Sequence, residues 1–147
     1  TYAGFNCLYG TIKQPELMCF NNQTNKAVAI SDGVHGLSNA FLNTDWPKVN
    51  DGKQTIQHLL LEEWSDESWL QFLHNTNAAN DVRLPNTGIG IEKERLLSSR
   101  FIRSESYGTR CSTVITVTKD STVNFTERTY FADQNTDTRH FSFKVMQ

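Results

Sequence analysis

The hydrophobic residues of this 147-residue chain alternate at both ends and recur at helical spacing in the middle. Near the start, Phe5, Cys7 and Tyr9 would share one face of an extended strand, and residues 139–145 alternate in the same way. A strand period, a helix period and a second strand period in this order indicate an α+β fold, with antiparallel sheets and helices.

The first 38 residues predict an antiparallel meander of four strands. Asp32-Gly33 lies between two β-compatible runs and predicts a type I′ hairpin turn, because that turn needs positive φ at both central residues. The expected strands cover residues 2–12, 16–21, 27–31 and 34–38.

The middle of the chain predicts three helices. Trp46-Pro47 suits a helix start, because proline at the first helical position loses no needed donor. Ser65 is a suitable N-cap for a second helix, and acidic residues follow it in the first turn. A third helix is expected over residues 92–103, after a polar loop over 75–85. Three further strands are expected over residues 112–118, 122–131 and 139–145.

Charge and hydropathy argue against several functional classes. The net charge is -2 and no basic stripe is visible, which argues against nucleic-acid binding. No apolar run approaches the roughly 20 residues of a membrane-spanning helix. Cys7, Cys19 and Cys111 match no zinc or redox spacing, so reduced thiols of an intracellular protein are expected. The four histidines share no metal pattern, so no metal site is predicted, although any one of them could ligate haem.

Several short motifs occur along the chain in one family's order. They are Gly4-Phe5-Asn6, residues 36–41 with 46–49, residues 84–88 with 94–99, residues 101–102, residues 107–114 and residues 125–130. Together they resemble the NRDE family, also called the transport and Golgi organisation protein 2 family, over nearly the whole chain. Asp45 stands where the family usually has proline.

The resemblance implies the C-terminal part of an αββα sandwich like that of the N-terminal-nucleophile (Ntn) hydrolases. Residues 1–147 would form a single, incomplete domain, because the sequence does not begin with the family's Met-Cys and does not contain its Asn-Arg-Asp-Glu motif. Its main partner would be the missing N-terminal half of the same fold. Half of such a fold cannot bury both sheet faces, so we expect exposed apolar surface on the faces of Phe5 or Phe141.

Three residues are candidates for a functional site. The resemblance to bile-salt-hydrolase-like enzymes implies that Asn39 is an oxyanion donor, although it could instead cap a turn. Arg100 stands in a Ser-Arg-Phe stretch like the one that carries an active-site arginine in those enzymes, or is a solvent-facing helix arginine. Arg110 could bind a carboxylate through both guanidinium nitrogens, or form a structural ion pair. Thr1 would suit an N-terminal nucleophile, but the resemblance places it in mid-protein, where a fragment boundary explains it better.

The resemblance implies a factor in Golgi organisation, protein secretion and haem or lipid trafficking. It would be a non-catalytic carrier with haem or lipid as cargo and no required cofactor, located in the cytoplasm, mitochondria or Golgi. One alternative is an Ntn-type amidohydrolase of linear amides whose N-terminal cysteine lies outside this chain. Another is a truncated isoform that acts as a protein-binding module.

Overall fold

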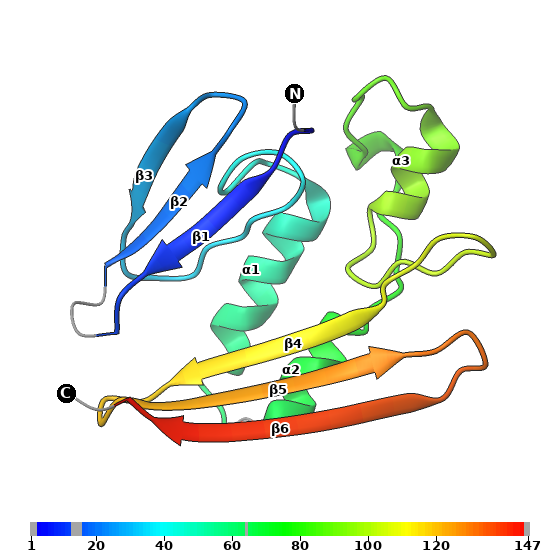
Figure 1. Ribbon diagram of the computed structural model, residues 1–147. Coiled ribbons are helices and arrows are strands. Elements are labelled where there is room, and N and C mark those ends of the chain that lie inside the picture. Colours follow the sequence, from blue (N-terminus) through cyan, green and yellow to red (C-terminus); the bar gives the residue numbers. More distant parts are fainter. Residues whose placement is uncertain (1–2, 13–15, 64, 146–147) are drawn as a thin grey trace.

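The structure is a computed structural model that describes residues 3–12, 16–63 and 65–145. Within these ranges the chain forms two three-stranded antiparallel sheets and three α-helices (Figure 1). The predicted α+β class is confirmed. Thr1 lies outside the described residues.

The first sheet contains β1 (Asn6–Gly10), β2 (Leu17–Asn21) and β3 (Lys26–Ile30) in that order. Three of the four predicted strands of the meander are therefore confirmed, and the fourth, over residues 34–38, is wrong. Gly33 does adopt a positive φ of 127°, but the chain leaves the sheet after it. The backbone N–H of Gly36 donates to Asn43 Oδ1, and its carbonyl accepts from the Asn43 N–H at 2.7 Å. A nearby loop, rather than β3, thus satisfies this backbone.

The first two helices begin as predicted. Pro47 is the first residue of α1 (Pro47–Leu59). Ser65 caps α2 (Asp66–Leu73), and its side-chain oxygen accepts from the Ser68 backbone N–H at 3.3 Å. None of the described helices is long and apolar enough to cross a bilayer.

The third helix is shorter than predicted. α3 (Ile91–Leu97) ends six residues before the expected end at residue 103. Phe101 N–H donates to the Asn75 carbonyl at 2.9 Å, and the Leu97 carbonyl accepts from Lys48 Nζ instead of from a later turn of helix. These contacts across the fold replace the hydrogen bonds that would continue the helix. The loop expected over residues 75–85 contains a short 3₁₀ turn, η1 (Asp81–Arg83).

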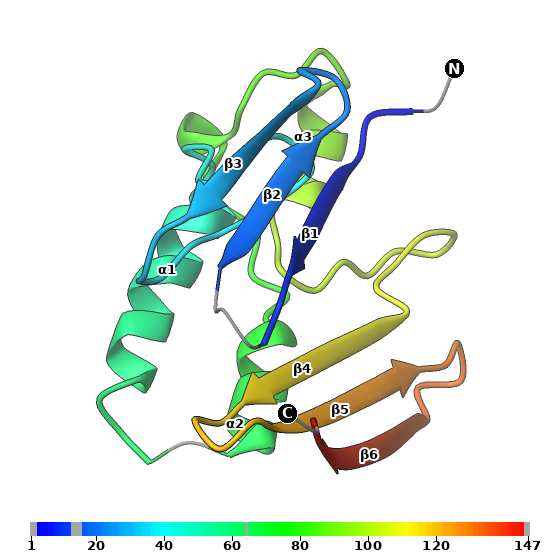
Figure 2. The ribbon, with the colours of Figure 1, turned by 60° about the vertical axis from the view of Figure 1, so that its left-hand side comes forward.

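The second sheet contains the strands β4 (Cys111–Val117), β5 (Thr122–Tyr130) and β6 (Thr136–Lys144). All three predicted strands are confirmed, and β6 begins three residues earlier than expected. Helix α2 packs against one face of this sheet (Figures 1 and 2). There the hydroxyl of Thr126, which is only 2% exposed, donates to Asp66. Arg128 and Glu67 form an ion pair at 2.8 Å on the same face.

The opposite face of the second sheet is an open apolar surface. Because opposed residues on neighbouring strands share a face, the strand register aligns Ile115, Phe125 and Phe141 in one row. Val117, Val123 and Phe143 form a second row. Phe141 is 57% exposed, and Phe5 beside the first sheet is 46% exposed. Exposed apolar surface was expected at Phe5 or at Phe141, and both residues are exposed.

Candidate functional site

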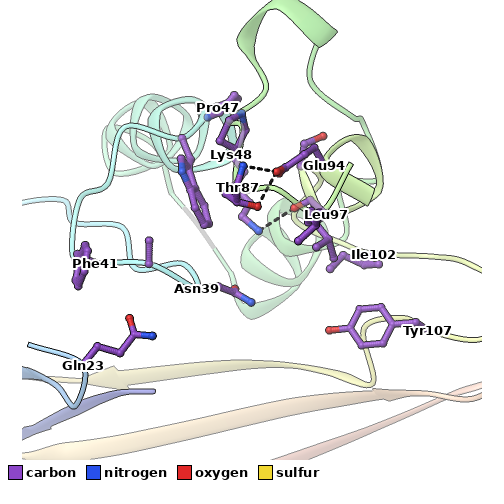
Figure 3. Close-up of a pocket in the computed structure, with 15 residues that line it drawn as sticks. Gln23, Asn39, Phe41, Pro47, Lys48, Thr87, Glu94, Leu97, Ile102 and Tyr107 are labelled. Atoms are coloured by element: carbon purple, nitrogen blue, oxygen red, sulfur yellow. Dashed lines mark hydrogen bonds between the residues drawn. The ribbon is translucent and has the colours of Figure 1, made fainter. Parts of the chain in front are cut away.

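A hollow of about 460 Å³ lies where the start of α1 meets α3 and the loop after β3 (Figure 3). We call it the α1–α3 pocket. Its inner wall is mostly buried or half-buried, and its rim is exposed. The lining residues are Gln23, Asn39, Ala40, Phe41, Trp46, Pro47, Lys48, Pro85, Thr87, Ile89, Glu94, Leu97, Ser98, Ile102 and Tyr107.

Nearly the whole lining comes from the motifs that carry the family resemblance. Only Gln23 and Ile89 lie outside them. The motif residues that line the pocket are spread from residue 39 to residue 107, and nothing in their spacing requires that they meet. Their convergence on one hollow makes this pocket the best candidate for the functional site.

Contacts with β1 and α1 hold the loop after β3 at the pocket. Asn6 Nδ2 on β1 donates to the Ala40 carbonyl at 2.8 Å. Further along, Gly36 lies so close to α1 that a Cβ there would be 2.7 Å from Val49 Cγ1. Glycine is needed at this position because any side chain would push the loop away from the helix.

Lys48 is the cation of the inner wall. Its Nζ donates to the Leu97 carbonyl at 2.9 Å, which joins the first turn of α1 to the last residue of α3. The ammonium lies 5.8 Å from the Trp46 ring centroid and forms no ion pair within the described residues. Burial lowers the pKa of Lys48, because the charged form is the one that loses hydration.

Glu94 is a buried carboxylate, 6% exposed, that fixes the loop on the other side of the pocket. Its Oε1 accepts from the Thr87 backbone N–H at 2.7 Å and from the Thr87 hydroxyl at 2.6 Å. The loop turns at Gly88 and Gly90, which both have positive φ. Glu94 is thus held by two donors, and it has no cationic partner in the described part of the chain.

Asn39, one of the candidates from the sequence, lies on the pocket rim. Its side chain forms no hydrogen bond within the described ranges, so the expected alternative role as a turn cap is not seen there. Figure 3 shows its amide turned toward the phenol of Tyr107, which comes from the far side of the rim. Both groups are free to donate a hydrogen bond to a ligand.

Arg100 lies elsewhere, in a different hollow that Asp51 and Arg83 also line. Its Nε donates to the Phe72 carbonyl at 3.0 Å, and its guanidinium stacks 4.3 Å from the centre of the Phe72 ring. Burial lowers the pKa of Arg100. This arginine is therefore half-buried and lies outside the helix, and it does not line the same hollow as Asn39.

Arg110 occupies a third place. It is exposed, directly precedes β4, and lines a hollow with Tyr130 and the aromatic pair His74–Phe101, whose rings stack at 4.0 Å. Among the described residues Arg110 has no ion pair, so the structural alternative for this side chain is not seen there. The three candidates thus line three adjoining hollows, because the α1–α3 pocket shares Lys48 with the hollow of Arg100 and Tyr107 with the hollow of Arg110. Within the described ranges, histidine, cysteine and acidic side chains form no group suited to a metal ion.

The model of the family described as transport and Golgi organisation 2 matches residues 1–132. The chain belongs to this family. A bovine transport and Golgi organization protein 2 homolog is 31% identical over 148 residues, which cover 92% of this chain and 54% of the relative. A human homolog of the same name is 31% identical over 86% of this chain and 51% of its own length. The chain therefore spans about half the length of the curated relatives it matches.

In this member of the transport and Golgi organisation 2 family, sequence reasoning missed Lys48 and Glu94. Both lie inside the quoted motifs, in Trp46-Pro47-Lys48-Val49 and residues 94–99. Charged residues in helices usually face solvent, and no local signal marks these two as buried. The one available signal was their position within motifs that are rich in apolar and small residues.

Proposed function

We propose that this protein is a non-catalytic carrier that serves Golgi organisation and secretion, with haem or lipid as cargo held in the α1–α3 pocket. The observation that carries the proposal is the convergence of the family motifs on one hollow of about 460 Å³. Its walls are largely apolar, with Phe41, Trp46 and Leu97 among them. The names of the relatives support a role in transport and Golgi organisation. A location in the cytoplasm, in mitochondria or at the Golgi is part of the same proposal.

The walls suit binding better than catalysis. Apolar pockets with few polar groups bury most of a ligand and use those groups to orient it. An amidohydrolase would need a nucleophile, a base and oxyanion donors around one point. The Asn39 amide, which has no hydrogen-bond partner among the described residues, favours this alternative, and the nucleophile of such an enzyme would come from outside the chain. Acyl-amide turnover by the full-length protein that is lost in Asn39→Ala would support the enzyme.

Haem titration tests the carrier, with the Soret band as readout. We expect saturable binding by the full-length family protein that contains this segment. Leu97→Trp would fill the pocket and weaken haem affinity at least tenfold, which corresponds to about 1.4 kcal/mol. Val82→Trp is the control, because Val82 is 95% exposed and lies outside the pocket. A flat titration, or equal affinities for both variants, would contradict the proposal.

We further propose that the remaining half of the family fold covers the open sheet faces. The accessible surface of the chain is 10797 Å². A folded monomer of this size exposes roughly 7,600 Å², so the excess is about 3,000 Å². An excess of this size is comparable to what obligate interfaces bury. The alternative, a protein-binding module, would cover the same faces with another protein.

Thermal melting distinguishes the remaining half of the fold from another protein as the cover of the sheet faces. A polypeptide that contains both halves should melt cooperatively at a higher temperature than the 147-residue chain, and it should bind less of a dye specific for apolar surface. Cooperative melting of the 147-residue chain at high temperature would contradict the proposal that the other half of the fold covers its sheet faces. Recovery of one defined partner at fixed stoichiometry by the short chain would favour the protein-binding module.

A further inference from the structure

We propose that Lys48 captures aldehydes with apolar tails as a Schiff base inside the α1–α3 pocket. This activity is separate from the carriage of haem, and it rests on the proposed function only in using the same hollow. The inference comes from a half-buried amine on the inner wall of a largely apolar cavity, for which the described residues provide no ionic partner.

The surroundings of Lys48 favour its neutral, nucleophilic form. Its burial is not compensated by a carboxylate, since the described part of the chain offers it no ion pair. Lys48 is also the second residue of α1, and the positive end of a helix disfavours a nearby ammonium. A desolvated lysine of this kind reacts with carbonyl compounds faster than a hydrated surface lysine, because more of it is in the neutral form.

The geometry fixes the amine without blocking it. One N–H of Lys48 donates to the Leu97 carbonyl at 2.9 Å, and a neutral amine keeps this contact, although an ammonium forms it more strongly. The nitrogen lone pair is not used in that contact and remains available for attack. The carboxylate of Glu94 on the same wall is already engaged by Thr87 and does not compete for the amine.

The proposed step balances without an oxidant or a cofactor. The amine lone pair attacks the aldehyde carbon, a C–N bond forms, and the carbonyl π electrons move to oxygen. A proton passes from nitrogen to that oxygen, and loss of water with the second amine proton leaves the imine. Asn39 and Tyr107 on the rim offer donors for the carbonyl oxygen as the ligand enters (Figure 3).

The shape of the pocket selects the substrate class. The aldehyde group must reach the inner wall, while exposed Phe41, Ile89 and Tyr107 on the rim would contact an apolar tail. A small hydrophilic aldehyde would gain nothing from these contacts. A carboxylate of the same length requires a charged Lys48, and its preferred binding is the main competing outcome.

The test traps the imine in the full-length protein with nonanal and cyanoborohydride, followed by peptide mass mapping. We expect Lys48 to be alkylated at least tenfold faster than Lys93, an exposed lysine on α3 that serves as the internal control. Its rate should also rise less between pH 7 and pH 9 than the rate of Lys93. Nonanoic acid at equal concentration should not protect Lys48.

Lys48→Met should abolish the selective product, and Lys93→Met should leave it intact. Because the wild-type map alone identifies the site, a variant that fails to fold does not weaken the test. Uniform labelling of all lysines, or strong protection by nonanoic acid, would overturn the inference. Haem binding without selective labelling would refute only this inference, and selective labelling without haem binding would refute only the haem carrier.

Discussion

Thr126→Val should loosen the contact between α2 and the second sheet. The Thr126 hydroxyl donates to the Asp66 carboxylate and lies 2.9 Å from His140 Nδ1, so one buried group joins the start of α2 to β6. Valine has nearly the same shape but cannot form either hydrogen bond. A hydrogen bond to a charged group contributes about 1.5–3 kcal/mol. Asp66 is about one-third exposed and can recover water in the variant, so we expect a loss of about 1–2 kcal/mol.

Urea denaturation followed by far-ultraviolet circular dichroism measures this loss. With a slope of about 1–3 kcal/mol per molar urea, the midpoint should fall by roughly 0.3–2 M at an unchanged slope. Thr136→Val is the matched control, because Thr136 is an exposed strand residue without a side-chain hydrogen bond in the described structure. It should stay within about 0.5 kcal/mol of the parent. Equal midpoints for the two variants would refute the reasoning.

Three further predictions follow from other contacts. The hydrogen bond from Arg128 lowers the pKa of Glu67. This ion pair should therefore stabilise the fold above a pH of about 4 and lose its effect as the pH falls further. Urea midpoints measured across an acid pH series check this. Gly36→Ala places a Cβ against Val49 and should cost about 1–3 kcal/mol of unfolding free energy, measured in the same assay. Arg100→Met should lower the free energy of unfolding but leave haem affinity unchanged. A loss of haem affinity in this variant would contradict the prediction, because it would show that Arg100 affects the α1–α3 pocket.

The sequence alone determined most of the secondary structure. Alternation of apolar and polar residues indicates a strand, and the Ser65 cap indicates a helix start. Both signals depend on residues only a few positions apart, so they do not depend on the tertiary context. The two failures, over residues 34–38 and 98–103, have a common cause. Gly36 bonds with Asn43, and Phe101 bonds with Asn75, in place of the partners that a strand or a longer helix would provide.

Only the tertiary structure decided the site. The motifs identified Asn39, Arg100 and Arg110 as candidates, but their separation into three hollows depends on how the helices pack. Lys48 and Glu94 were recognisable as charged residues, but their burial was not visible in the sequence. The burial of Lys48, for example, depends on a segment roughly 40 to 50 residues away. The local pattern of a chain sets its strands and helices. The environment of a charge, and therefore its chemistry, is set by whatever distant residues exclude water from it.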